Sequence, residues 1–148
     1  MTFLSSAVQR LGLGDVVELH SGISHEEALA RQRESQQLLL ICWSNLTDAP
    51  AFTIPAKLFE YLAARRPILS IGQEGGGVAE ILRTTGAGQH VDSPDSLRSF
   101  LKRSYDEFLL HGSIQYNGNG SAIEHFSQRG MARKMAQLLD RTVSAKAT

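Results

Sequence analysis

The stretch FTIPAKLFEYLAARRPILSIGQEGGGVAEIL, residues 52–82, decides the fold class because helix and strand signals alternate along it. Its first part predicts a helix over residues 55–65. Pro55 falls in the first turn, where its missing N–H costs little, and Thr53 two residues earlier is a candidate N-cap. The expected core stripe of this helix is Leu58, Phe59, Leu62 and Ala63.

The second part of the stretch predicts a strand, a helix and a further strand. Pro67 ends the first helix, and PILSI, which it opens, has the length and apolar content of a strand. GVAEILRTT at 77–85 predicts a short helix closed by Gly86, and GQHV at 88–91 predicts the next strand. Such strict alternation is typical of a parallel sheet with right-handed crossovers.

The same alternation extends toward the N-terminus. VVELH at 16–20 predicts a first strand. Ser24 with Glu27 three positions on forms a capping box, which predicts that a helix starts near residue 25. LLLICW at 38–43 is apolar without alternation, and this pattern is typical of a strand covered on both faces.

Beyond the strand at 88–91 the pattern becomes helical. Three helix starts are expected: at Asp92 or Ser93 with Pro94 in the first turn, at Ser121 with Glu124, and at Ser127. The first of these helices carries one apolar face, made of Leu97, Phe100, Leu101, Tyr105, Phe108 and Leu109. The chain is therefore expected to end in helix.

These segments together predict one α/β domain, a Rossmann-like parallel sheet with flanking helices. In such sheets ligands bind outside the carboxyl ends of the strands. The loops expected at that edge are residues 21–24, 44–54 and 72–78. A ligand site is therefore expected among these loops.

The composition limits the partners of the chain. Its 148 residues, 42% of them hydrophobic, suffice for one domain with a core. Lys and Arg number 15, as do Asp and Glu, so no general attraction to nucleic acid is expected. The longest apolar run, at 38–43, is far shorter than the roughly 20 residues of a membrane-spanning helix. The single Cys42 forms no internal disulfide, which favours a cytoplasmic location.

The residue types that hold metals or perform hydrolysis lack the necessary patterns. The five histidines show no metal-ligand spacing, so no metal is expected. No G-x-S-x-G elbow is present. Cys42 lies inside a predicted buried strand, which suits an inert core thiol.

Lys57, Glu60 and Tyr61 share one side of the predicted helix, away from its core stripe. One interpretation is a surface ion pair between Lys57 and Glu60, worth about 0.3 kcal/mol. The other is a site in which the helix N-terminus and Lys57 bind a phosphate while Glu60 accepts hydrogen bonds from a ribose. The spacing alone does not separate the two.

Three glycines at 75–77 precede the next helix. They form neither a G-x-G-x-x-G fingerprint nor a P-loop. One interpretation is a flexible turn between strand and helix; the other is a close approach of a phosphate or sugar to the backbone of Gly75 and Gly76.

Two segments, KLFEYLAARRPILSIG (57–72) and EGGGVAEILRTTGAG (74–88), resemble the donor-binding half of GT-B glycosyltransferases, in particular the retaining family-4 group. DVVELHSGISHEEALARQRESQQLLLICWSN (15–45) resembles that family's strand, Gly-x-(Val/Ile) turn, helix and buried strand. IEHFSQRGMARKMAQLLD (123–140) resembles its C-terminal helix. The likeness spans roughly residues 10–142.

The resemblance implies a nucleotide-sugar-binding domain of the GT-B C-terminal type. It implies a nucleoside-diphosphate sugar as donor, a saccharide or lipid-linked acceptor, and a role in cell-envelope or exopolysaccharide synthesis, with no cofactor and no metal. Family members carry an E-x7-E pattern whose second Glu holds the ribose, and Glu60 matches that position.

Other site residues follow from the same resemblance, and one departs from it. Lys57 would lie near the diphosphate, and the backbone of Gly22 and Ile23 near the base. For the glycines at 75–77 the resemblance favours the close approach of a phosphate or sugar. Phe52 stands where the first Glu is expected, and Thr53 is the candidate hydroxyl residue in that loop.

A complete transferase of this type also has an acceptor-binding domain and a basic phosphate clamp. The chain begins after both, so residues 1–148 are expected to be a partial donor domain that by itself turns over little or no sugar. Membrane attachment would then come through the absent acceptor domain, and the catalytic residues stay unassigned. Two alternatives are a non-catalytic module that binds a nucleotide or a partner chain, and a sugar-nucleotide epimerase of similar architecture.

Overall fold

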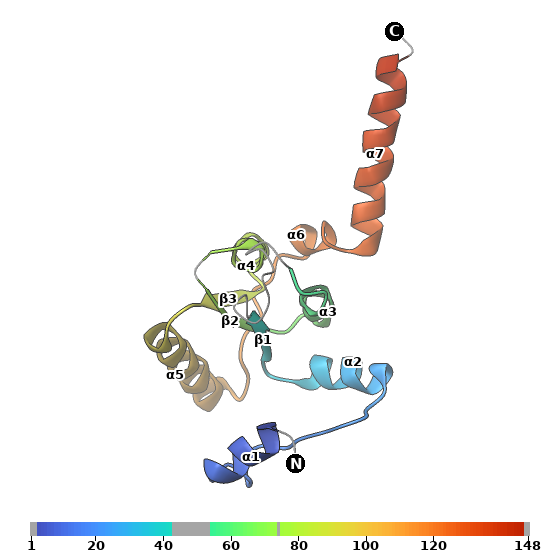
Figure 1. Cartoon of the computed structure of the whole chain (residues 1–148). Coiled ribbons are helices and arrows are strands. Elements are labelled where there is room, and N and C mark those ends of the chain that lie inside the picture. Colours follow the sequence, from blue (N-terminus) through green and yellow to red (C-terminus); the bar gives the residue numbers. More distant parts are fainter. Residues whose placement is uncertain (1–2, 43–53, 74, 147–148) are drawn as a thin grey trace.

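The protein has an α/β fold with a three-stranded parallel sheet flanked by helices (Figure 1). The computed structural model describes residues 3–42, 54–73 and 75–146, with side chains up to residue 143. The strands lie in the order β1 (Leu38–Cys42), β2 (Ile68–Gly72) and β3 (Gly88–Val91). Leu38 pairs with Ile68, and Ile68 pairs with Gly88, so the three strands start level.

Helices precede, connect and follow these strands. They are α1 (Phe3–Arg10), α2 (His25–Glu34), α3 (Lys57–Ala64), α4 (Gly77–Thr85), α5 (Pro94–His111), α6 (Gly120–Glu124) and α7 (Gln128–Lys146). The predicted alternation from α2 to β3 is confirmed. α1 was not predicted.

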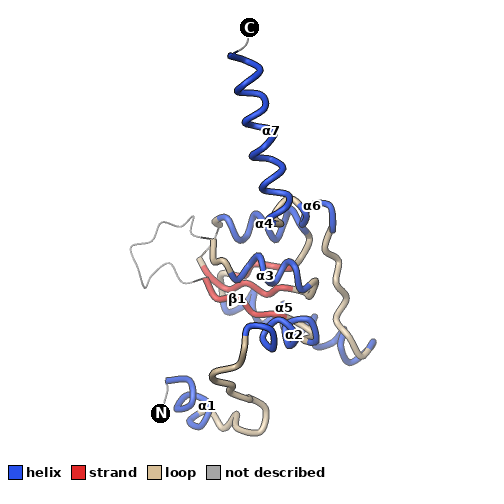
Figure 2. Tube along the Cα trace, turned by 90° about the vertical axis from the view of Figure 1, so that its right-hand side faces the viewer, coloured by secondary structure: helices blue, strands red, loops and turns tan. Residues whose placement is uncertain are grey.

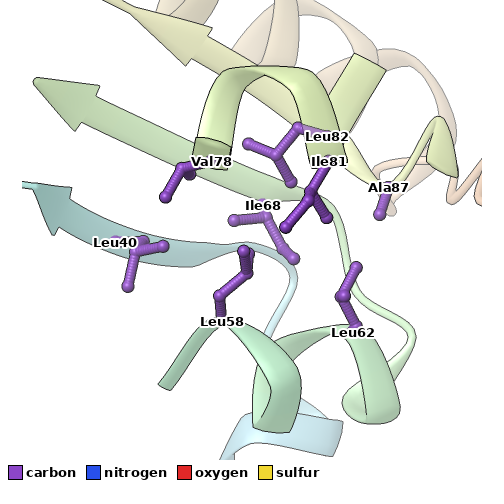
Figure 3. Close-up of a cluster of buried hydrophobic side chains, with 8 residues drawn as sticks. All are labelled: Leu40, Leu58, Leu62, Ile68, Val78, Ile81, Leu82 and Ala87. Atoms are coloured by element: carbon purple, nitrogen blue, oxygen red, sulfur yellow. The ribbon is translucent and has the colours of Figure 1, made fainter. Parts of the chain in front are cut away.

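The core lies between one face of the sheet and the helices α3 and α4. Its buried side chains are Leu40, Leu58, Leu62, Ile68, Val78, Ile81, Leu82 and Ala87 (Figure 3). Leu58 and Leu62 come from the predicted stripe of α3, and Phe59 packs against the cluster. Ala63 is exposed and was wrongly assigned to this stripe, because the short helix turns it away from the sheet.

Side-chain caps fix several helix starts as predicted. The hydroxyls of Ser24, Ser93 and Ser127 accept hydrogen bonds from backbone N–H groups in the first turns of α2, α5 and α7. The prediction for α6 was wrong: Asn119 is its N-cap and accepts from the backbone N–H groups of Ser121 and Ala122. An Asn side chain just ahead of the helix satisfies the same orphan donors that Ser121 was expected to serve.

The predicted strand at 16–20 does not form. Residues 17–20 have no regular secondary structure, and the Val16 side chain is largely exposed. A strand needs a neighbour for its backbone hydrogen bonds, and this segment pairs with no described strand. Its side chains form local contacts instead, with His20 beside both Glu18 and Arg31.

β1 is covered on one face only, which corrects the expectation of a fully buried strand. Leu38 and Leu40 face the core, whereas Leu39 and Ile41 are each 49% exposed. α5 lies beside β3 on this second face, where its Arg103 donates a hydrogen bond to Gln89 (Figure 1). No described helix covers β1 from that side. The strand is therefore half exposed, although its sequence does not alternate between apolar and polar residues.

The last two long helices also expose apolar side chains. In α5 these are Leu101, Tyr105, Phe108, Leu109 and Leu110, and in α7 they are Met131, Met135, Leu138, Leu139 and Val143. α7 extends away from the sheet in both views (Figures 1 and 2). Among the described residues, no helix combines the length and the apolar content needed to cross a bilayer.

Candidate functional site

The N-termini of α2, α3 and α4 lie on the side of the sheet where its strands end (Figure 2). α3 follows β1 and α4 follows β2, so both begin beside the carboxyl ends of parallel strands. α2 leads back to the start of β1 and therefore begins on the same side. A Cβ added to Gly77 would lie 2.9 Å from the Ile54 side chain, so the segment just ahead of α3 approaches the start of α4.

Lys57 and Glu60 meet at the first turn of α3. The Lys57 ammonium donates a hydrogen bond to Oε2 of Glu60 at 2.7 Å, and both side chains are accessible, at 46% and 32%. Leu58 in the same turn is fully buried and anchors this end of the helix. An accessible, paired carboxylate thus stands in the first turn of α3, where the N–H groups of Leu58 and Phe59 donate to the backbone oxygens of Pro55 and Ala56.

The third residue of the predicted group serves the fold. The Tyr61 hydroxyl donates a hydrogen bond to the backbone oxygen of Leu39 in β1, and burial raises its pKa. Tyr61 therefore ties α3 to the sheet.

Glu60 has a second protein partner that the sequence did not reveal. Gln32 in α2 is buried, and its Nε2 lies 3.4 Å from Oε2 of Glu60. The two residues are 28 positions apart, so no local pattern pairs them. A glutamine between two arginines of α2 was the one available signal.

The pKa of Glu60 lies below its ordinary value of 4.5 because Lys57 donates a hydrogen bond to the carboxylate. Partial burial opposes this shift, and the Gln32 amide adds to it. Since the pKa is lower in the folded state, the pair stabilises the fold above the unfolded pKa, and this contribution is lost as the pH falls through the folded pKa.

Lys57→Met is expected to raise the pKa of Glu60, because the first cause of its depression is removed. Carbon-13 NMR titration of the glutamate carboxyls measures the shift. Lys102→Met, which breaks the ion pair of Lys102 with Asp106 on α5, is the matched control and leaves the Glu60 titration unchanged. An unaltered Glu60 titration in Lys57→Met would contradict the pairing.

The glycine turn ahead of α4 has a backbone that other residues rarely adopt. Gly75 has φ 81° and Gly76 has φ 90°, and Gly76 occupies the N-cap position without a side-chain cap. A Cβ at Gly75 would meet no atom within 4 Å. No described side chain therefore caps the first N–H groups of α4.

The remaining predicted site residues are less closely tied to Glu60. Gly22 has φ 70° and Ile23 is partly exposed, and both precede the Ser24 cap of α2. His25, the next residue, is near enough for its charge to contribute to the lowered pKa of Glu60. Thr53 lies outside the described residues, and Ala56 rather than Thr53 occupies the N-cap position of α3, which begins two residues later than predicted.

A polar row crosses the sheet near the same edge. The Ser70 hydroxyl, which is fully buried, lies 3.0 Å from Nδ1 of His90 and 3.4 Å from Sγ of Cys42. Nε2 of His90 lies 2.8 Å from the backbone oxygen of Gln73. An N–H at Nε2 satisfies that carbonyl and leaves Nδ1 to accept from Ser70. The row fixes the start of the loop between β2 and α4.

Within the described parts of the chain, no group of three His, Cys, Asp or Glu side chains is arranged to hold a metal ion.

No family model, curated protein or solved structure matches the chain. The resemblance to family-4 glycosyltransferases therefore rests on the quoted segments alone.

Proposed function

We propose that this chain is the donor-binding part of a retaining GT-B glycosyltransferase and binds a nucleoside-diphosphate sugar at the carboxyl edge of its sheet. The observation that supports this best is the Glu60 carboxylate, which is ionised, accessible and held by Lys57 at the start of α3. The glycine start of α4, which has no side-chain cap, approaches the Ile54 side chain just ahead of α3.

The arrangement suits the two polar parts of such a donor. The diphosphate binds the N–H groups at the start of α4, with Lys57 adding a positive charge. Glu60 accepts hydrogen bonds from the ribose hydroxyls. The ion pair does not exclude ligand binding, because the Lys57 ammonium has three N–H donors and can donate to a phosphate while it remains bonded to Glu60.

Transfer of the sugar also requires a surface that binds the acceptor. The leaving diphosphate must be stabilised while an acceptor hydroxyl, on a saccharide or a lipid-linked saccharide, is held against the anomeric carbon. The carboxyl edge of this sheet supplies the donor side. An acceptor-binding domain, in the same protein or in a partner, supplies the other.

Glu60→Ala is expected to weaken binding of uridine or guanosine diphosphate by about 10-fold or more, because the ribose loses a charged hydrogen-bond acceptor. Isothermal titration calorimetry with both nucleotides measures this. Asp106→Ala is the control: Asp106 accepts a hydrogen bond from Lys102 at the same 2.7 Å, but on α5. Absence of binding by the wild-type chain at millimolar nucleotide would refute the donor site.

The alternative is a non-catalytic module that binds a separately encoded acceptor domain. The half-exposed Leu39 and Ile41 favour it, as does the edge of β1 that pairs with no described strand, since open edges and apolar faces attract other chains. Nucleotide binding that depends on Glu60 discriminates between the two, because partner binding through β1 does not require that carboxylate.

A further inference from the structure

Three polar side chains are buried among the described residues: Gln32, Ser70 and Thr85. Gln32 differs from the other two in what it contacts. Thr85 bonds the backbone at the end of its own helix, and Ser70 bonds side chains within the sheet. Gln32 instead reaches from α2 to a carboxylate at the edge where the proposed ligand binds.

The two donors to Glu60 converge on one oxygen. Lys57 Nζ lies 2.7 Å and Gln32 Nε2 lies 3.4 Å from Oε2. No hydrogen bond from the described residues reaches Oε1. A carboxylate oxygen accepts about two hydrogen bonds, so Oε2 is occupied and Oε1 is the oxygen left for a ligand hydroxyl.

The orientation of the Gln32 amide is set by this contact. Its Oε1 is buried and has no hydrogen-bond partner among the described residues. Turning the amide over would bring that oxygen against the ionised carboxylate, which is repulsive. The amide therefore faces Glu60 with its NH₂ group and leaves its own oxygen unpartnered.

Such an arrangement costs stability. A buried acceptor without a partner costs about 1–3 kcal/mol, whereas an apolar side chain of the same shape avoids that penalty. A stabilising role alone therefore does not explain an amide at this position.

We infer that Gln32 is a positioning residue of the proposed nucleotide site: it holds the Glu60 carboxylate so that Oε1 faces the ligand. This inference rests on the proposed function. It adds α2 to the two helices already at the site. The hydrogen bond also contributes to the lowered pKa of Glu60, after that from Lys57, which keeps the carboxylate ionised as an acceptor.

Gln32→Met tests the inference, because methionine has a similar length and shape but donates no hydrogen bond. Calorimetry with uridine and guanosine diphosphates is expected to show binding about 3- to 10-fold weaker than wild type. Adding Gln32→Met to Glu60→Ala is expected to cause no further loss, since the amide acts through that carboxylate. Gln137→Met, at an exposed position of α7, is the matched control and leaves the affinity unchanged.

A second measurement distinguishes positioning from packing. Gln32→Met is expected to raise the pKa of Glu60 in a carbon-13 NMR titration without nucleotide, which a packing role would not do. Gln32→Asn, an amide one methylene shorter, serves as a second variant if circular dichroism shows that Gln32→Met is unfolded. Gln32→Asn is expected to weaken nucleotide binding by the same factor as Gln32→Met.

The outcomes separate this inference from the proposed function. Unchanged affinity in the folded Gln32 variants, with a loss in Glu60→Ala, would overturn the positioning role and leave the donor site standing. The role is supported if Glu60→Ala and the double variant lose the same affinity and if Gln32→Met raises the pKa of Glu60. A wild-type chain that binds neither nucleotide would overturn the proposed function, and the role of Gln32 with it.

Discussion

Leu58→Ala is expected to lower the free energy of unfolding by about 3 kcal/mol, within the range for deleting a buried leucine side chain. Leu58 is fully buried and sits in the cluster that joins α3 to the sheet and α4. The neighbouring helices are held by their own strands and cannot close the space. Urea denaturation followed by circular dichroism measures the change.

Leu110→Ala is the matched control for this prediction. Leu110 is in α5 and 76% exposed, so the same substitution there is expected to change the stability by less than about 0.5 kcal/mol. Equal effects at the two positions would contradict the assigned core.

The loss at Leu58 bears on function because of its place in the chain. It lies between Lys57 and Glu60 in sequence and faces the opposite way, toward the sheet. Looser packing of this turn lets the ion pair move relative to α4. Nucleotide affinity is therefore expected to fall together with stability, although Leu58 touches no ligand.

The part of the fold between α2 and β3 was predictable because its signals are local. Ser24 ahead of α2, Gly86 at the end of α4 and the apolar stripe of α3 each act within one or two helical turns. The strands between them are short and apolar. Local hydrogen bonding and periodicity agree with the tertiary contacts here, so sequence reasoning reached the correct elements.

The incorrect predictions concern segments whose structure depends on the elements packed beside them. VVELH at 16–20 has strand propensity, but a strand forms only where another strand accepts its hydrogen bonds. The exposed Leu39 and the exposed stripes of α5 and α7 show the same limit, because periodicity identifies an apolar face and not what covers it.

In the candidate site, too, local contacts were predictable from the sequence and tertiary contacts were not. Lys57 and Glu60 are one helical turn apart, so their contact followed from spacing. Gln32 approaches Glu60 only because α2 and α3 pack side by side, a tertiary event that no spacing within α2 indicates. The same holds for Ser70 and His90, which are 20 positions apart and meet across paired strands.

Gly88→Ala is expected to destabilise the protein by about 3 kcal/mol or more, as overpacking adds to the loss of backbone hydrogen bonding. Gly88 starts β3 and pairs with Ile68 of β2. A Cβ at this position would overlap the backbone carbonyl of Ile68, which belongs to a paired strand and cannot turn away as a flexible side chain does. β2 and β3 must therefore separate at this end.

That separation reaches the core and then the site. The backbone N–H of Ile68 donates to the oxygen of Ala87, next to Gly88, and both side chains belong to the buried cluster. Moving β3 also displaces His90, whose ring contacts the oxygen of Gln73 ahead of the glycine turn. We expect the variant to unfold at lower urea and to bind nucleotide more weakly even while folded.

Gly120→Ala is the matched control, because it adds the same methyl group at a glycine with no other atom close by. Gly120 opens α6, and a Cβ there meets nothing within 4 Å, so alanine is expected to be neutral or to stabilise by up to about 1 kcal/mol through the unfolded state. Urea denaturation of both variants gives the comparison. If Gly88→Ala unfolded at the wild-type urea concentration, the close approach of β2 and β3, and with it the path from β3 to the glycine turn, would be wrong.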